Sequence, residues 1–424
     1  MNIKIVSLKK PVHALVLIAL SLLASPIQGQ GYVKSIKEAL EVNYRPSLYF
    51  GAGTLSEFPD SILLINNLRH LSISQCSITT LPENIGSLTS LEQLYLGEIP
   101  IVRLPESVCQ LENLTHLNLH GSSIKELPEC IGAMKSLKYL SLDKTALNTL
   151  PESIGELKNL KSLSLYESAI SYLPESIGDL DNLTRLSLDS DSIRFIPRSI
   201  GRLKNLEQLQ IDETNLDTMP SEIANISTLR SLSLYSYKDH NLYDWILELE
   251  NLNRLSISGS ITSLEGISEM KYLEEIFVVK SKLRSLPDEI GELDSLKELS
   301  VFRNNISSLP ESIGNLKKLE SIPALGNEIE AIPLSICNLK NLKKLGLTHN
   351  KINSIPDEIG NMTGLKELYV SGNMLKTLPK SILKIKSLES LRAWGNFISK
   401  EEIEWWEKNL KAQTSFKPQN RRSE

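Results

Sequence analysis

The sequence predicts an α/β solenoid, in which one short structural unit is repeated along most of the chain. The phrase LPESIG occurs three times, beginning at Leu150, Leu173 and Leu309. An LxxLxL-like motif recurs every 23 residues from Leu68 and, after a single shorter step of 21, continues at 23 to Leu388. Within each motif, apolar and polar residues alternate. A fixed period of this length is the signature of a repeat architecture rather than of several ordinary domains.

The coil that begins at Leu160 shows how each element arises. Its segment LKSLSLY alternates apolar and polar residues, which is the period of a half-buried strand. Pro174 ends the strand side, and ESIGDLDN then crosses the opposite face as a short helix or 3-10 turn. One coil alone buries too little apolar surface to offset the entropy of ordering its backbone. Coils must therefore stack, with a shared leucine core and a parallel sheet on the inner side.

The full template is LxxLxLxx(N/C/T/S)xI followed by xxLPxxIGxLxx, and it resembles the leucine-rich repeat family over residues 45 to 399. The resemblance implies a leucine-rich repeat solenoid of about sixteen coils. Such a solenoid is a curved right-handed superhelix, with parallel strands on the concave face and short helices or 3-10 turns on the convex face. The LPxxIGxL variant is similar to that of bacterial leucine-rich repeat proteins and of Ras-group repeats in eukaryotic signalling proteins.

The resemblance also implies a ladder of Asn side chains that bond backbone groups from coil to coil. The ladder position falls eight residues after each leading Leu. The last five coils carry the Asn, at Asn304, Asn327, Asn350, Asn373 and Asn396. Earlier coils replace it with Cys76, Ser122, Thr145, Ser168, Asp191 and Thr214. We therefore expect a weaker ladder in the first half of the chain.

Residues 1–31 are expected to be a secretory signal peptide. Lys4, Lys9 and Lys10 precede the apolar run VHALVLIALSLLA, and small residues follow it. Cleavage near residue 29 or 31 would remove three lysines and no acidic residue, so that the formal charge of -5 would become -8. A membrane span needs about 20 apolar residues, more than this run provides. The alternative is a short anchor that is never cleaved.

The ends of the solenoid are expected to be covered, because an open stack exposes its core. Residues 32–44 predict a cap helix, residues 45–398 the repeat domain, and residues 399–411 a second cap helix. Ser399 and Glu402 fit a capping box, and Trp405 and Trp406 can cover the last coil. Residues 412–424 are expected to be a disordered tail.

The four cysteines are Cys76, Cys109, Cys130 and Cys337, and they show no CxxC spacing, which argues against a zinc site. Cys109 and Cys130 fall at nearly matching positions of adjacent coils, so an exported protein could bridge them. Buried thiols that act as small apolar side chains are the better supported alternative.

One stretch, LYSYKDHNLYDWILELEN, breaks the rhythm, because Tyr243 stands where a proline is expected. A contact loop around Asp239, His240 and Trp245 on the outer face is one interpretation. A local change of coil type that alters the curvature is the other, and it is better supported.

Recognition must depend on residues that vary at outward strand positions. Six residues after each leading Leu, consecutive coils predict an acidic, tyrosine-bearing patch, with Glu167 and Glu213 beside it. It consists of His120, Asp143, Tyr166, Asp189, Asp212 and Tyr235. A binding patch of this charge favours a basic partner.

Later coils present an apolar stripe at outward positions. It consists of Phe277, Val279, Phe302 and Leu325, and Tyr369 and Trp394 continue it. Exposed apolar patches mark interaction sites, and aromatic residues are enriched in protein interfaces. The alternative is that these rings only pack on one another along the sheet.

Several classes of function are disfavoured. The formal charge of -5 argues against nucleic-acid binding, and the sequence has no GxSxG, HExxH, Walker or kinase motif. Asp189, Asp191, Asp212 and Glu213 supply oxygens but no calcium-loop spacing. We treat the grouping of His116, His120 and Asp143 as coincidental. No catalytic residue, metal or cofactor is therefore expected.

The sequence thus predicts a non-enzymatic, exported, bacterial leucine-rich repeat protein, secreted or held in the periplasm or cell envelope. It is expected to be a monomer that binds a protein partner through its concave face, with no nucleic acid and no membrane span after signal removal. Two alternatives are a cytoplasmic Ras-group-like signalling scaffold and a glycan or cell-wall binding module.

Overall fold

The computed structural model describes residues 36–41, 46–189, 192–212, 216, 219–237 and 244–416. The predicted signal peptide lies outside the described residues. The chain forms two compact units, Met1–Ile226 and Ser227–Glu424, and each is described by itself. In the described part of the chain, no helix has both the length and the apolar character needed to cross a bilayer.

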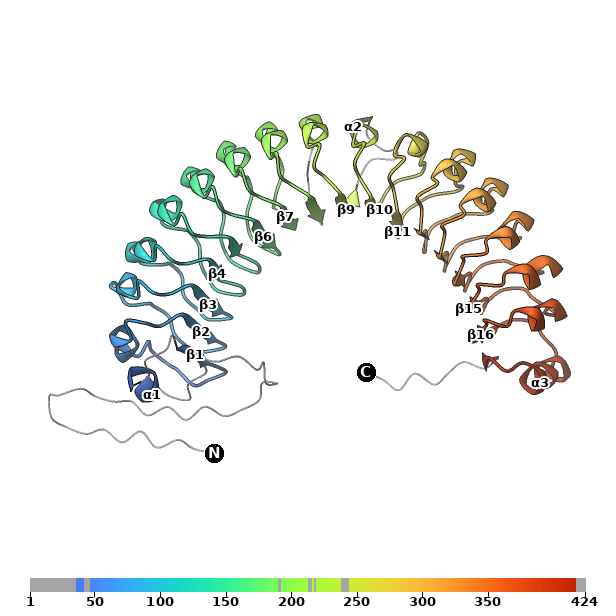
Figure 1. Cartoon of the computed structure of the whole chain (residues 1–424), viewed down its shortest axis with the longest axis horizontal. Coiled ribbons are helices and arrows are strands. Elements are labelled where there is room, and N and C mark those ends of the chain that lie inside the picture. Colours follow the sequence, from blue (N-terminus) through green and yellow to red (C-terminus); the bar gives the residue numbers. More distant parts are fainter. Residues whose placement is uncertain are drawn as a thin grey trace. The chain divides into compact units, whose positions relative to one another are not determined.

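The first unit is a stack of coils, each of which contributes one strand and one 3-10 helix (Figure 1). It begins with α1 (Ile36–Glu41). Its strands are β1 (Ser47–Phe50), β2 (His70–Ser74), β3 (Gln93–Gly97), β4 (His116–Asn118), β5 (Tyr139–Ser141), β6 (Ser162–Tyr166), β7 (Arg185–Asp189) and β8 (Gln208–Asp212). Its 3-10 helices are η1 (Asp60–Leu64), η2 (Ile85–Ser87), η3 (Glu106–Gln110), η4 (Glu129–Ala133), η5 (Glu152–Glu156), η6 (Glu175–Asp179), η7 (Arg198–Arg202) and η8 (Ser221–Asn225).

The second unit repeats this plan. Its strands are β9 (Ser231–Tyr237), β10 (Arg254–Gly259), β11 (Glu275–Val279), β12 (Glu298–Ser300), β13 (Ser321–Pro323), β14 (Lys344–Gly346), β15 (Glu367–Tyr369), β16 (Ser390–Arg392) and β17 (Gln413–Ser415). Its helices are α2 (Asp244–Leu247), η9 (Ile267–Glu269), η10 (Asp288–Glu292), η11 (Glu311–Asn315), η12 (Leu334–Asn338), η13 (Asp357–Asn361), η14 (Lys380–Lys384) and α3 (Lys400–Asn409).

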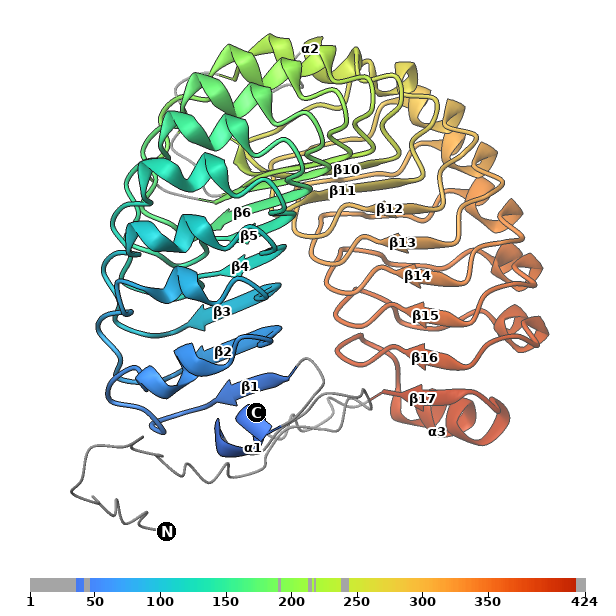
Figure 2. The ribbon, with the colours of Figure 1, turned by 60° about the vertical axis from the view of Figure 1, so that its left-hand side comes forward.

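Within each unit, consecutive strands pair in parallel and in the order of the sequence (Figure 2). The register advances by one coil, so that Leu163 on β6 lies opposite Leu186 on β7. In each unit the strands line the inner side and the 3-10 helices the outer side (Figure 1). The predicted α/β leucine-rich repeat solenoid is therefore confirmed.

The repeated phrase accounts for each part of the coil. Leu163, Leu165 and Ile177 are fully buried, as the alternation predicts. Pro174 has the extended conformation, with φ -68° and ψ 154°, and it directly precedes η6. Proline is suited to this place because it cannot continue the strand ladder but is tolerated at a helix start.

The glycine of the phrase permits close stacking of the coils. A Cβ atom added to Gly178 on η6 would lie 2.1 Å from the carbonyl oxygen of Ser199 on η7. The same clash recurs at Gly155, where the Cβ would lie 2.5 Å from the carbonyl oxygen of Ser176. The IG pair therefore buries its isoleucine and leaves room for the next coil.

The Asn ladder is present in the second unit. The amide of Asn327 donates to the carbonyl oxygens of Val301 (2.9 Å) and Ala324 (3.1 Å), and its oxygen accepts from the N–H of Ile306 (3.1 Å). In the first unit, the hydroxyl of Thr145 donates only within its own coil, to Leu142 (2.7 Å). Asp191 and Thr214 lie outside the described residues.

A turn in the left-handed conformation precedes the ladder position. Seven residues after the leading Leu, Lys144, Glu167 and Arg303 have φ values of 54°, 51° and 57°. Glycine occupies the same place in other coils, as at Gly372 with φ 63°. Non-glycine residues adopt this conformation at an energetic cost.

The C-terminal end of the second unit carries α3. The hydroxyl of Ser399 accepts a hydrogen bond of 3.2 Å from the N–H of Glu402, and the Trp406 side chain is buried. The range assigned to a disordered tail is partly ordered, because β17 pairs with β16. Gln413, Thr414 and Ser415 are all polar, so no apolar alternation predicts a strand there.

The irregular stretch contains α2, and the side chain of Trp245 is buried. A contact role on the outer face is therefore wrong for this residue. Asp239, His240 and Tyr243 lie outside the described residues. A local change of coil type agrees with the burial of Trp245 and Ile246.

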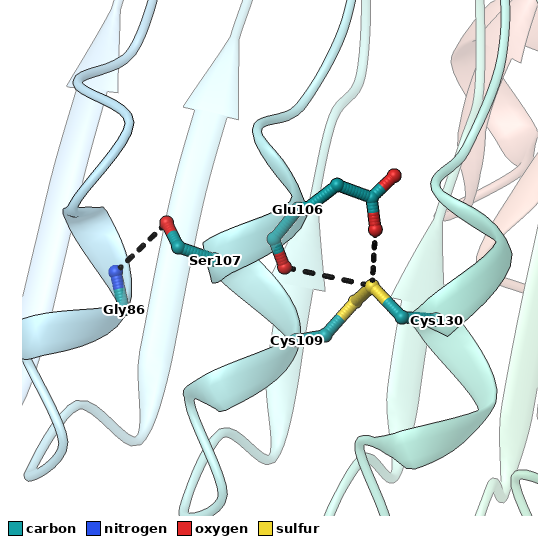
Figure 3. The surroundings of a disulfide bond; sticks show 5 residues. All are labelled: Gly86, Glu106, Ser107, Cys109 and Cys130. Carbon is teal, nitrogen blue, oxygen red and sulfur yellow. Dashed lines mark hydrogen bonds between the residues drawn. A yellow bond between two sulfur atoms is a disulfide. The ribbon is translucent and has the colours of Figure 1, made fainter.

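A disulfide joins Cys109 on η3 to Cys130 on η4, with 5.9 Å between their Cα atoms (Figure 3). The preference for buried thiols is therefore wrong for this pair. Adjacent coils hold the two residues side by side, which the spacing alone could not decide. Cys76 and Cys337 are free and buried, and burial raises the pKa of the Cys337 thiol to about 11.

Candidate functional site

The predicted acidic column of the first unit is largely engaged in hydrogen bonds. The carboxylate of Asp143 accepts from the hydroxyls of Ser141 (2.9 Å) and Ser164 and from the N–H of Tyr166 (2.9 Å). Because Ser164 and Tyr166 belong to β6, Asp143 ties its own coil to the next one. Its carboxylate therefore has a structural role before any role in recognition.

The other two aspartates of the column are buried. Asp189 and Asp212 expose only 5% and 7% of their surface, and Gln210 donates a hydrogen bond to Asp212. The expectation that these carboxylates are accessible is therefore wrong. The alternation of the strand predicts an outward position for both, but the structure buries both side chains.

Tyr166 is the most exposed of the described residues of this column in the first unit, with an exposed fraction of 38%. Beside it, Glu167 forms an ion pair of 3.4 Å with Lys144. Glu213 lies outside the described residues. Tyr235, which is also exposed, belongs to the second unit.

Sequence reasoning missed a cluster of tyrosines and histidines at the start of the strand face, which we call the Tyr–His cluster. It comprises Tyr49, His70, Tyr95, His116 and Tyr139, on β1 to β5. The rings of His116 and Tyr139 stack with 4.4 Å between their centroids. The signal was present in the sequence, because these residues fall two and four positions after their leading residues.

Both histidines of the Tyr–His cluster are held in place by hydroxyl groups. Nδ1 of His70 lies 2.9 Å from the Ser47 hydroxyl, and Nδ1 of His116 lies 2.8 Å from the Thr115 hydroxyl. Burial lowers the pKa of both imidazoles, and Arg69 and Lys138 lower them further. The two rings are therefore neutral near pH 7 and present a flat, uncharged surface.

In the second unit, two aromatic residues of the predicted stripe, Phe277 and Tyr369, have cationic side chains over their rings. The guanidinium of Arg254 lies 4.5 Å from the ring centroid of Phe277. Arg392 and Lys344 lie 4.6 Å and 5.6 Å from the ring centroid of Tyr369. These cation–π contacts hold the cations against the strand face.

The remaining members of the stripe lie at the ends of strands. Phe302 and Leu325 are half-buried and follow β12 and β13. Trp394 packs edge-on against His349, with 5.5 Å between ring centroids. Val279 is buried and does not contribute to the surface. Ser300, Pro323 and Gly346 separate Phe277 from Tyr369 along the sheet, so the stripe is interrupted.

Ion pairs flank these aromatic residues. Arg254 pairs with Glu275, and Lys344 pairs with Glu367 at 3.3 Å. Glu298 lies between them on β12, where burial and the charge of Glu275 raise the pKa of its carboxyl group. The strand face of the second unit therefore combines half-buried rings with closely spaced charges of both signs.

One set of metal-ligating side chains comes together within the described residues, namely Glu106, Cys109 and Cys130. Both sulfur atoms are in the disulfide, so neither can supply the thiolate that a metal site would use. Of the four acidic residues for which calcium binding was disfavoured, Asp189 and Asp212 are buried, and Asp191 and Glu213 lie outside the described residues.

A stacked scaffold that fixes its core positions and varies the side chains on its strand face defines a class of repeat proteins that bind other molecules. Comparison with known proteins agrees with this class. A model described as a leucine-rich repeat region matches residues 60–138 and 129–213, and leucine-rich repeat models match residues 340–398 and 295–316.

A solved leucine-rich repeat protein of Leptospira interrogans is similar over nearly the whole chain. The two sequences are 34% identical. The match covers 91% of this chain and 100% of the Leptospira protein, with a TM-score of 0.85. The chain therefore belongs to the leucine-rich repeat family.

Two Listeria monocytogenes internalins share the fold at lower identity. The functional domain of InlJ is 17% identical with a TM-score of 0.62, and covers 85% of this chain and 75% of its own. InlF is 20% identical with a TM-score of 0.54, and covers 84% and 88%. The search of curated proteins returned no match.

Proposed function

We propose that this chain is a non-enzymatic, exported binding protein that recognises a protein partner through its strand faces. The observation that carries the proposal is the pair of cation-bearing rings at Phe277 and Tyr369. Arginine and aromatic residues dominate the binding energy of protein interfaces. Two such cation–π pairs on the strand face of one unit are therefore best explained by a partner.

The nature of the surface favours a protein partner with both apolar and charged groups. Phe302 and Leu325 add apolar area beside the rings, and the ion pairs of Arg254 and Lys344 fix its charge pattern. The formal charge of -5 favours association with a basic protein, since long-range attraction speeds encounter. Asp143, Asp189 and Asp212 contribute to this field and to the scaffold more than to direct contact.

Export and a bacterial cell-envelope or secreted location are part of the proposal. The basic and apolar N-terminal pattern supports export, and the similarity to a Leptospira protein supports a bacterial origin. N-terminal sequencing of protein from its native cells tests it. An intact Met1 in a cytoplasmic fraction would favour the signalling scaffold instead.

A binding experiment tests the strand face directly. Envelope proteins are captured on the immobilised wild-type chain, and the captured protein is purified and titrated by calorimetry. We expect Phe277→Ala and Phe302→Ala each to weaken its affinity by about tenfold or more. Tyr272→Ala is the control, because Tyr272 is an exposed aromatic residue outside the strands. Equal affinities for all four proteins would sink the proposal.

The Tyr–His cluster favours a second candidate, a glycan ligand. Flat, uncharged rings beside the polar groups of Gln93 and Asn118 suit the faces and hydroxyls of sugars. Glycan-array binding that is lost in Tyr95→Ala but kept in Phe277→Ala would support this candidate. Absence of any glycan signal would leave the protein partner.

A further inference from the structure

A groove on the flank of the first unit is separate from the strand faces. It lies where three consecutive coils enter their 3-10 helices η3, η4 and η5, and it has a volume of about 530 Å³. The LPE portions of the repeated phrase line it, from Leu104 to Glu106, from Leu127 to Glu129 and from Leu150 to Glu152. The buried leucines and the prolines give the groove an apolar floor.

The charged residues that line the groove are mostly acidic. Five glutamates line it, namely Glu83, Glu106, Glu126, Glu129 and Glu152, and Arg103 is the single cationic residue among the lining. Arg103 forms an exposed ion pair of 3.4 Å with Glu83. Glu106, Glu129 and Glu152 occupy equivalent positions of successive coils, so negative charge follows the groove along its length.

Aromatic side chains extend the groove at one end. Tyr172 is 54% exposed and lines it. Phe195, one coil further, is 60% exposed, and backbone bridges align both residues with Thr149. Exposed aromatic rings beside carboxylates suit lysine and arginine, whose apolar stems pack on rings and whose charged ends reach the acids.

The disulfide fixes the spacing within the groove. Cys109 and Cys130 join η3 to η4, which begin at Glu106 and Glu129. A carboxylate oxygen of Glu106 lies 3.0 Å from the sulfur of Cys130 (Figure 3). Two of the glutamates are therefore carried on coils that are covalently tied together, which reduces the entropy lost when a ligand binds.

We infer that this groove binds an extended, lysine- or arginine-rich peptide segment of a partner protein. Its charge demands a cation, its apolar floor accommodates side-chain stems, and its course across successive coils suits an extended chain. The inference does not depend on the strand faces. It also assigns the attraction for basic partners to exposed glutamates instead of the buried Asp189 and Asp212.

Fluorescence anisotropy with the full chain tests the inference. The probe is a fluorescein-labelled peptide of five Lys-Pro repeats, which is extended and cationic. We expect it to bind the wild-type chain, and its affinity to fall about tenfold in the double variant Glu129→Gln with Glu152→Gln. Tyr172→Ser should weaken it by about threefold.

The matched control lies in the second unit. Glu311 occupies the same repeat position as Glu152, and both carboxylates accept a hydrogen bond from a serine N–H two dozen residues on. The double variant Glu311→Gln with Asp357→Asn removes the same charge and should change the affinity by less than about twofold. Circular dichroism confirms that each variant is folded.

Three results would overturn the inference. One is failure of the peptide to bind the wild-type chain. Another is equal weakening by the two double variants, which would show attraction to net charge alone. The third is equal binding of a peptide of five Glu-Pro repeats. Unchanged peptide binding in Phe277→Ala would separate this groove from the proposed strand-face function.

Discussion

The carboxylate of Asp143 accepts a hydrogen bond of 2.9 Å from the backbone N–H of Tyr166, one coil further along the stack. The same carboxylate accepts from the Ser164 hydroxyl. In the first unit, an acidic residue on the strand face thus hydrogen-bonds one coil to the next, as the Asn ladder does in the second unit.

Replacing Asp143 with Ala should destabilise the chain by about 1–3 kcal/mol, because the N–H of Tyr166 loses its charged partner. Asp143→Asn keeps one acceptor oxygen and should lose less. Urea unfolding followed by circular dichroism measures both. A stability equal to wild type in Asp143→Ala would show that water replaces the carboxylate without loss.

The Asn ladder should make the two units unequally sensitive to truncation. Asn327→Ala removes three hydrogen bonds to backbone groups, two of which belong to the preceding coil, and should cost about 2–3 kcal/mol. Thr145→Ala removes one bond within its own coil and should cost about 1 kcal/mol. Urea titration of both variants provides the comparison. Similar losses would contradict a ladder role for Asn327.

The left-handed turns offer a stabilising substitution. Arg303 has φ 57°, and Arg303→Gly should raise the stability by about 0.5–1 kcal/mol, since glycine adopts this conformation without steric cost. Gly372→Ala should do the reverse, because φ is 63° and the added Cβ would lie 2.4 Å from Nδ1 of His349. Thermal melting checks the opposite signs.

Glu298 should make stability depend on pH. Its folded-state pKa is raised, so the folded protein binds the proton more tightly than the unfolded chain does, and this site favours folding as the pH falls. Glu298→Gln should therefore raise stability at neutral pH and lose that advantage toward about pH 4. Urea midpoints at both pH values test it. If the difference in urea midpoint between wild type and Glu298→Gln were the same at both pH values, titration of Glu298 would not explain the pH dependence.

The disulfide should contribute to stability because it restricts the unfolded chain. Its cysteines are 21 residues apart in sequence, and the double variant Cys109→Ser with Cys130→Ser should lose about 2–4 kcal/mol. Urea unfolding with and without a reducing agent gives the measurement. The reducing agent should lower the stability of the wild type and leave the double variant unchanged.

The fold could be predicted because its information is periodic. Leu163, Leu165 and Ile177 are buried for the same reason in every coil, so each repeat confirms the next. The strand face was harder to predict. Alternation shows that Phe277 and Asp212 point away from the core, but it does not show that Arg254 covers one ring or that neighbours bury the other side chain.

The flank groove lay beyond sequence reasoning for a different reason. Glu106, Glu129 and Glu152 belong to the repeated LPE segment, whereas the sequence predicts recognition by residues that vary from coil to coil. They line one groove only because the coils stack, and Tyr172 lines it with them. The repeat position of Tyr172 holds different residues in other coils. A constant residue can therefore gain a local role from a variable neighbour.

The close approach of Gly178 to Ser199 bears on how such a gene can change in length. At the junctions that carry a glycine, this residue lies against the backbone of the following coil, with no room for a side chain. Duplicating or deleting one complete period regenerates an identical junction, whereas an insertion of a few residues inside the phrase misaligns it. Selection on this gene should therefore tolerate size changes in whole periods and remove the others.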